Sequence, residues 1–244
     1  MKLKGARVLV TRPAGQAGAL LDLLQARGAQ ARHLPLVAIH DHGDPDAQRA
    51  VLAARRDFDG WIFTSANAAG RAAALDPGPW PTLFATGEGT ARALADAGHP
   101  GAHVAPSSAA SESLLGLAAL HPVQGRRFLV CTGVGGRDLL VHALRDAGAR
   151  VERLELYERA PVPHAPDAVA AAIDGTDAAI VTSGDALQRL WDLAPAAARV
   201  RLAGLVLVVP SQRVIELALR LGFAAPRAPA RMSDAHLVRC LEEA

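Results

Sequence analysis

Residues 7–34, RVLVTRPAGQAGALLDLLQARGAQARHL, align without gaps on residues 127–154, RFLVCTGVGGRDLLVHALRDAGARVERL, at an offset of 120. Two further pairs of segments repeat in the same order at nearly the same offset: IFTSANA matches IVTSGDA, and FATGEGTARALADAGH matches VVPSQRVIELALRLGF. The same structural units therefore occur twice along the chain, which predicts two similar domains with a cleft between them.

Each repeated unit has the pattern of a strand, a helix and a second strand. Residues 7–11 (RVLVT) are a short apolar run, typical of a buried parallel strand. Residues 16–26 place leucines on one helix face, and Gly28 closes the helix. Residues 30–34 are a second strand that ends at Pro35. This order is the signature of a βαβ unit.

The alternation continues along the chain. Further strands are expected at residues 60–64, 82–86, 127–132, 150–156, 177–182 and 205–209. Further helices are expected at residues 65–75, 87–98, 111–120, 133–148, 167–173, 183–193, 211–221 and 233–243. Strands of about five residues suit small flavodoxin-like sheets rather than a barrel, so the sequence predicts an α/β fold with parallel sheets.

Hydroxyl side chains stand where the predicted strands end, at the edge where open α/β sheets bind ligands. They follow six strands, together with one arginine: Thr11 and Arg12, Thr64 and Ser65, Thr86, Thr132, Thr182 and Ser183, and Ser211. Most of them are expected to cap helices. Helix N-termini also bind anions, so the same edge predicts a site for a molecule with several carboxylates or phosphates.

Tyr157 is the single tyrosine among the 244 residues, and it stands in LYERAP just before the proline-rich segment PVPHAP. A phenol at such a junction can donate a proton or a hydrogen bond into a cleft. The alternative is a half-buried aromatic side chain that only packs at a strand end.

Other features exclude several classes of protein. A net charge of +2 gives no support for a nucleic-acid partner. The chain has no GxGxxG, Walker A or GxSxG motif, and its nine histidines form no metal-ligand motif, so we expect no metal and read the histidines as surface residues. The two cysteines without a CxxC motif, the absence of a signal-peptide pattern and the lack of a membrane span lead us to expect a cytoplasmic protein.

A series of motifs runs from one end of the chain to the other: VLVTRPAGQA, WIFTSANA, ATGEGTARAL, SESLL, CTGVGGRDLL, LYERAP, IVTSGDAL and VPSQRVIELALRLGF. In the order of these motifs, with one tyrosine at the linker, the chain resembles the uroporphyrinogen-III synthase family. No single motif is specific, and their order carries the resemblance.

The resemblance implies two flavodoxin-like α/β domains joined by two extended linkers, with one domain inserted in the other. Residues 1–34 would pair with residues 161–244, residues 37–156 would form the inserted domain, and the linkers would span about residues 35–40 and 155–166. The repeat taken alone favours contiguous halves divided near Gln124 instead.

The resemblance also implies a reaction, a lyase-type cyclisation of hydroxymethylbilane to uroporphyrinogen III. Water leaves the hydroxymethyl group, ring D attacks through its substituted carbon, and ring D recombines inverted. This route requires no cofactor. We expect a monomeric enzyme that acts on a small molecule, with a transient hand-over of the substrate from hydroxymethylbilane synthase.

Site residues follow from the same resemblance. Tyr157, on a linker facing the interdomain cleft, is the candidate donor to the departing hydroxyl. The candidate substrate-binding residues are Arg12, Ser65, Thr86, Thr132, Arg137, Ser183 and Ser211. Arg12 and Arg137 would pair with carboxylates, and a plain helix-surface role for Arg137 stays open.

Two other classes of function remain to be weighed. A non-catalytic small-molecule receptor also has two α/β domains with linkers, but such receptors are usually exported. A nucleotide-dependent transferase or reductase would need the phosphate-binding motifs that the sequence lacks.

Overall fold

The computed structural model describes residues 1–104, 114–136 and 138–244. The chain divides into two compact units, one made of Met1–Ala38 with Ala160–Ala244 and the other of Ile39–Arg159. The second unit is therefore inserted in the first, and the chain is not cut into contiguous halves at Gln124.

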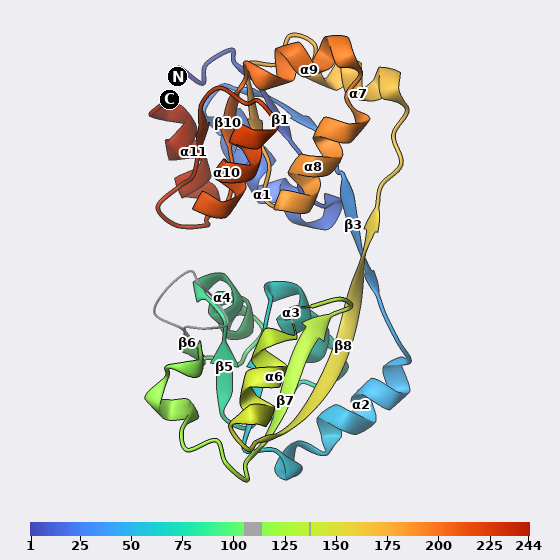
Figure 1. The fold of residues 1–244 in the computed structure, drawn as a ribbon, viewed down its shortest axis with the longest axis vertical. Helices are drawn as coiled ribbons and strands as arrows, with labels where there is room; N and C mark the ends of the chain where they lie inside the picture. The colour runs from blue at the N-terminus through green and yellow to red at the C-terminus, as the bar shows by residue number, and fades with distance from the viewer. Residues whose placement is uncertain (105–113, 137) are drawn as a thin grey trace. The chain divides into compact units, whose positions relative to one another are not determined.

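The first unit, whose helices α7 to α11 are labelled in Figure 1, is built on a five-stranded parallel sheet with the order β11-β10-β9-β1-β2. Its strands are β1 (Arg7–Val10), β2 (Gln30–His33), β9 (Ala178–Ile180), β10 (Val206–Val208) and β11 (Pro226–Arg227). Its helices are α1 (Ala14–Ala26), α7 (Pro166–Ile173), α8 (Gly184–Leu193), α9 (Ala196–Ala203), α10 (Gln212–Arg220) and α11 (Asp234–Glu242).

The second unit is built on a six-stranded sheet with the order β3-β8-β7-β4-β5-β6. Strands β4 to β8 pair in parallel with one another. The strands are β3 (Val37–Asp41), β4 (Gly60–Phe63), β5 (Leu83–Ala85), β6 (His103–Val104), β7 (Arg127–Gly133) and β8 (Arg150–Pro161). The α-helices are α2 (Pro45–Ala53), α3 (Ala66–Leu75), α4 (Glu88–Asp96) and α6 (Leu139–Asp146), with short 3₁₀ turns at Arg55–Asp57 and Ala118–Leu120.

The period-two alternation of strand side chains divides each core into two layers. In β1, Leu9 packs with α7, α8 and α10, whereas its neighbours Val8 and Val10 pack with α1 and α11. In β4, Trp61 and Phe63 pack with α3 and α4, whereas Ile62 packs with α6. Both sheets are therefore covered by helices on both faces. Because successive side chains of each strand are buried on opposite faces, the strand sequences are continuous apolar runs.

The predicted alternation of strands and helices is confirmed, because two-domain α/β architecture with parallel sheets is what the structure shows. No element was expected at residues 45–53 or 196–203, where the structure has α2 and α9. The helix predicted at residues 111–120 lies partly outside the described residues, and its last three residues form a 3₁₀ turn.

Strand β8 is longer than expected. It was predicted to end near Leu156, with a linker from about residue 155, but it runs on to Pro161 and is hydrogen-bonded to β3 on one side and β7 on the other. Tyr157 therefore lies in a paired strand rather than in a free extended segment. In the part of the chain that the structure describes, no helix is long and apolar enough to cross a membrane.

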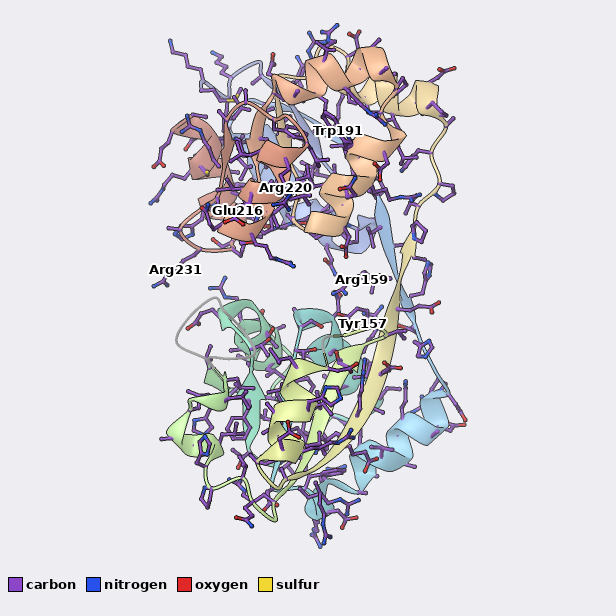
Figure 2. All side chains as sticks on the ribbon, in the orientation of Figure 1. Tyr157, Arg159, Trp191, Glu216, Arg220 and Arg231 are labelled. Atoms are coloured by element: carbon purple, nitrogen blue, oxygen red, sulfur yellow. The ribbon has the colours of Figure 1, made fainter. Side chains whose placement is uncertain are left out.

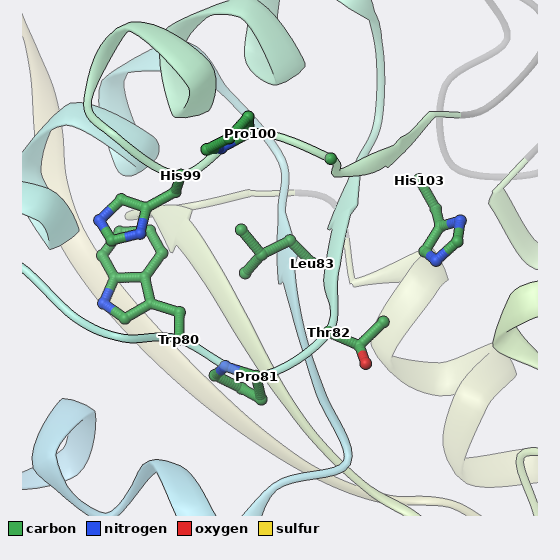
Figure 3. Close-up of a pocket in the computed structure, with 8 residues that line it drawn as sticks. Trp80, Pro81, Thr82, Leu83, His99, Pro100 and His103 are labelled. Atoms are coloured by element: carbon green, nitrogen blue, oxygen red, sulfur yellow. The ribbon is translucent and has the colours of Figure 1, made fainter.

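One histidine contradicts the expectation that all nine lie at the surface. His99 is buried, and its imidazole stacks on the indole of Trp80 with ring centroids 3.5 Å apart and planes within 3° (Figure 3). Its Nε2 atom finds no hydrogen-bond partner among the residues that the structure describes. Burial lowers the pKa of His99 below its ordinary value, and the Asp76 carboxylate offsets part of this shift.

We predict that His99 makes the stability of the protein fall as the pH drops through the weakly acidic range. The unfolded chain takes up the His99 proton first, so the stabilisation is complete above about pH 6.5 and is lost below it. The substitution His99→Phe should flatten the change in urea midpoint between about pH 7.5 and 5.5 relative to wild type. Equal slopes for the two proteins would show that His99 does not carry this dependence.

Candidate active site

The carboxyl ends of four neighbouring strands in the second unit bring the predicted hydroxyl residues together. Along the sheet they stand in the order β8, β7, β4 and β5. They are Tyr157 in β8, Thr132 in β7, Thr64 and Ser65 after β4, and Thr86 after β5. Four of the predicted site residues therefore share one edge of one sheet, because parallel strands end on the same side.

A β-bulge orients Tyr157. Thr132 pairs with Glu155, but the next residue, Gly133, pairs with Tyr157, so β8 has one extra residue at this point. The bulge breaks the alternation of the strand, and Leu156 and Tyr157 are both buried in the same layer of the core. Without it, Tyr157 would face the opposite side of the sheet from Leu154 and Leu156.

Gly133 makes room for the tyrosine ring. A methyl group built on Gly133 would lie 2.5 Å from Cζ of Tyr157 and 2.7 Å from Cε2. Only a residue without a side chain fits at this position in β7. The main chain holds the pair as well, because Val134 N donates to Tyr157 O at 2.8 Å.

The Tyr157 hydroxyl has two polar neighbours in the described part of the chain. Its oxygen lies 3.0 Å from Ser65 Oγ, and Arg159 Nη2 donates to it at 3.1 Å. The guanidinium carbons of Arg159 and Arg71 lie 5.4 and 5.5 Å from the ring centroid. Figure 2 labels Tyr157 and Arg159 near the same end of β8. Two positive charges thus flank a buried phenol.

Ser65 holds the start of α3 and contacts the tyrosine at the same time. Its Oγ accepts a hydrogen bond from Ala68 N at 3.1 Å, as an N-cap does. The sequence predicted capping together with a compatible ligand-binding role for this residue, and the geometry combines capping with a contact to the phenol. Ser65 is partly exposed, whereas Tyr157 is only 2% exposed.

The threonines beside this cluster are hydrogen-bonded within the protein, with Thr86 and Thr132 buried and Thr64 partly buried. Thr64 Oγ1 donates to Thr132 Oγ1 at 2.9 Å, and Thr86 Oγ1 donates to Thr64 O at 3.1 Å. These side chains tie β4, β5 and β7 together at the edge of the sheet. They are less available to a ligand than the sequence suggested, so main-chain N–H groups are the better donors there.

The first turn of α4 offers such donors. Its N-cap is Gly87, which has no side chain to accept a hydrogen bond from the first N–H groups of the helix. Free N–H groups at a helix start favour an anion, although Glu88 adds a negative charge to the same turn.

The first unit presents a related edge. Arg12, Ser183 and Ser211 follow β1, β9 and β10, which are neighbours in its sheet. Ser183 caps α8 by accepting from Ala186 N at 3.1 Å, whereas Ser211 makes no side-chain cap bond to α10. Arg12 is already paired with Asp234, Nη1 to Oδ1 at 2.6 Å, so a ligand carboxylate would compete with an existing ion pair.

Arg137 lies outside the described residues, so its predicted role has no structural account. Arg159 and Arg71 were not among the predicted site residues. Arg159 had a readable signal, since residues two apart on a strand point to the same face and Arg159 is two residues after Tyr157. Among the described residues, no group of three or more His, Cys, Asp or Glu side chains is placed to hold a metal ion.

A cavity of about 330 Å³ lies elsewhere, at the amino ends of β5 and β6. Trp80, Thr82, His99 and His103 are among its lining residues (Figure 3). This is the opposite edge of the sheet from Tyr157, and none of the predicted site residues that the structure describes lines it. The convergence of hydroxyls and charges, rather than cavity size, therefore marks the candidate site.

Comparison with known proteins agrees with the resemblance seen in the motifs. A family model described as uroporphyrinogen-III synthase HemD matches residues 18–239 of the chain. The chain belongs to the uroporphyrinogen-III synthase family. A uroporphyrinogen-III synthase from Salmonella typhimurium is 32% identical to it, with 96% of this chain and 99% of the relative covered.

A second uroporphyrinogen-III synthase, from Escherichia coli K12, is 31% identical with the same coverage of both chains. Among solved structures, a mutant uroporphyrinogen III synthase from the extremely thermophilic bacterium Thermus thermophilus matches with a TM-score of 0.64 and 22% identity, covering 98% of this chain and 100% of that one. At this identity the structural match supports the fold alone, and the family assignment rests on the sequences.

We predict that Gly133→Ala displaces the Tyr157 ring, because the added methyl group has no space beside it. Overpacking of this kind costs about 1–3 kcal/mol of stability, and the hydrogen bond to Ser65 should be lost. Urea denaturation and a crystal structure of the variant would measure both effects. Gly70→Ala in α3 is the matched control, since a methyl group there meets nothing within 4 Å. An unmoved ring and unchanged stability in Gly133→Ala would contradict this account.

Proposed function

We propose that this protein is a uroporphyrinogen-III synthase that cyclises hydroxymethylbilane to uroporphyrinogen III, with loss of water and inversion of ring D. In reaction class it would be a lyase. Family membership supports the identity of the reaction, and the hydroxyl cluster around Tyr157 is the observation that supports where it occurs.

The chemistry asks the protein for control of shape more than for a strong reagent. Hydroxymethylbilane closes spontaneously to the isomer without inversion, so the enzyme must hold the chain in one arrangement during ring closure. The substrate has eight carboxylates, which N–H groups at helix starts and arginine side chains can bind. The carboxyl edge of each sheet supplies such groups, and this supports Arg12, Ser65, Thr86, Thr132, Ser183 and Ser211 as substrate-binding residues.

Departure of the hydroxyl group needs a proton, and the Tyr157–Ser65 pair can supply one. A phenol keeps its proton at neutral pH and so acts as a donor. The adjacent Arg159 guanidinium stabilises negative charge that builds up on the phenol oxygen as the proton leaves. The reaction as written uses no cofactor and no metal ion, and it consumes one small molecule.

The remaining proposals concern the state of the enzyme. We propose that it works as a monomer, since the cluster of Tyr157, Ser65 and Arg159 comes from one chain. A transient hand-over of the substrate from hydroxymethylbilane synthase would protect it from spontaneous closure. The buried free thiols of Cys131 and Cys240 suit a reducing compartment such as the cytoplasm.

We also propose that segments 35–40 and 155–166 connect the two folding domains, which the division of the chain at Ala38 and Arg159 supports.

The first test is a coupled assay in which hydroxymethylbilane synthase feeds fresh substrate to the purified protein. Isomer analysis of the oxidised product should give mainly isomer III, because the protein prevents closure without inversion. Formation of isomer I alone, at the rate without protein, would refute the proposed function and would favour a binding protein or another enzyme.

The second test is Tyr157→Phe. The variant should fold normally, because the phenyl ring keeps its place against Gly133. Its kcat should fall by about tenfold to a thousandfold, the usual effect of losing one proton or hydrogen-bond donor. Unfolding curves serve as the control for stability, and full wild-type activity would remove Tyr157 from the mechanism.

A further inference from the structure

The contact between Ser65 and Tyr157 uses only one of the two hydroxyl hydrogens of the pair. Ala68 N donates to Ser65 Oγ at 3.1 Å, and Arg159 Nη2 donates to Tyr157 Oη at 3.1 Å. The two hydroxyl oxygens lie 3.0 Å apart, and each carries one hydrogen. One of these hydrogens lies between the oxygens, so the other is left to point elsewhere.

The hydrogen that points elsewhere belongs to Ser65. Tyr157 is 2% exposed, and a buried hydroxyl hydrogen needs an acceptor. Among the described residues, Ser65 Oγ is the acceptor within hydrogen-bond distance of Tyr157 Oη, since the other neighbour is an arginine that only donates. A phenol is also a stronger donor than an alkyl hydroxyl. Tyr157 therefore donates to Ser65, and the Ser65 hydrogen is directed away from the cluster, from a side chain that is partly exposed.

We propose that Ser65, and not Tyr157, is the catalytic residue that passes a proton to the departing hydroxyl, with Tyr157 replacing that proton from behind. This inference rests on the proposed function and assigns the roles within it. Arg159 is a positioning residue, which acts on the substrate only through Tyr157.

Two protons move in sequence as water leaves. The Ser65 Oγ–H bond breaks and its proton moves to the oxygen of the substrate hydroxymethyl group. The carbon–oxygen bond breaks with its electron pair going to oxygen, and water leaves. The Tyr157 proton moves to Ser65 Oγ. Attack through the substituted carbon of ring D gives a spiro intermediate and releases no proton. After that intermediate fragments, the unsubstituted α-carbon of ring D forms the final bond and loses its proton, which returns through Ser65 to the phenol oxygen.

The surrounding charges fit this direction of transfer. As its proton leaves, the phenol oxygen gains negative charge at a distance of 3.1 Å from Arg159 Nη2. The Arg71 guanidinium lies over the same ring, although it also pairs with Asp41 at 2.8 Å. The Ala68 N–H group remains bonded to Ser65 Oγ throughout and fixes its position at the start of α3. No comparable cationic group is needed at Ser65, because that oxygen loses one proton and gains another.

The test compares Ser65→Ala, Tyr157→Phe and the double variant in the coupled assay. We expect Ser65→Ala to lower kcat by about a hundredfold to a thousandfold with little change in KM, and at least as much as Tyr157→Phe does. The double variant should be no slower than Ser65→Ala within about threefold, because both residues act in one path. Ser65→Thr, which keeps both the hydroxyl and the cap, should recover most of the rate.

Two measurements separate this role from a structural one. Rates in mixtures of H₂O and D₂O should show the curvature of two protons in transit for wild type and a linear dependence for Tyr157→Phe. Asp44→Ala removes the N-cap of α2 in the same unit, where the Asp44 side chain accepts from Asp46 N. This control should keep wild-type kcat, which shows that loss of a cap alone does not slow the reaction.

The outcomes are distinct. A larger loss for Tyr157→Phe than for Ser65→Ala, with independent effects in the double variant, would overturn the inference and make Tyr157 the direct donor. A slow Asp44→Ala variant, or a linear wild-type isotope dependence, would also overturn it. In each of these cases wild type still makes isomer III, whereas failure of the proposed function itself would leave wild type without that product.

Discussion

The close approach of the Tyr157 ring to Gly133 is the contact on which the arrangement of the candidate site depends. It requires a glycine at the end of β7 and one extra residue in β8, and together these turn the phenol toward the start of α3. A bulge next to a functional side chain is a common way to redirect it without changing the rest of a sheet. The hydroxyl contact with Ser65 and the position of Arg159 both follow from that turn.

The two units share the same βα plan, but the contact between Tyr157 and Gly133 belongs to the second unit. The duplicated βα units give both sheets helix starts at their carboxyl edges, and serines cap α3 and α8 in the same way. Only the copy in the second unit adds a tyrosine, since residues 150–156 of β8 lead into Tyr157 whereas Leu34 is followed by Pro35. Helix starts at the carboxyl edges of both sheets suit anion binding in both units, whereas the tyrosine suits proton transfer in the second unit.

Much of the fold could be predicted from the sequence because short apolar runs and helix starts are local signals. Strands β1, β4, β9 and β10 all lie within the predicted runs, and β7 extends beyond its predicted run by Gly133 alone. Strand β3 and helices α2 and α9 were not predicted, because their polar or alanine-rich sequences carry a weak periodic signal. The end of β8 was predicted too early, since pairing with β3 across the chain keeps the segment up to Pro161 extended, and no local pattern reveals such pairing.

The site was predictable in its residue types but not in its contacts. Ser65 and Tyr157 were both chosen from sequence, yet their partnership depends on a bulge that leaves no mark in the pattern. Arg12 was chosen for a carboxylate ligand, whereas the fold gives it Asp234.

The central claim is that the substrate binds at the carboxyl edges of the sheets, and amide hydrogen exchange with and without uroporphyrinogen III tests it most directly. We predict slower exchange at the first turns of α3, α4, α8 and α10. Protection at the Trp80–His99 cavity instead, with these turns unchanged, would contradict the account.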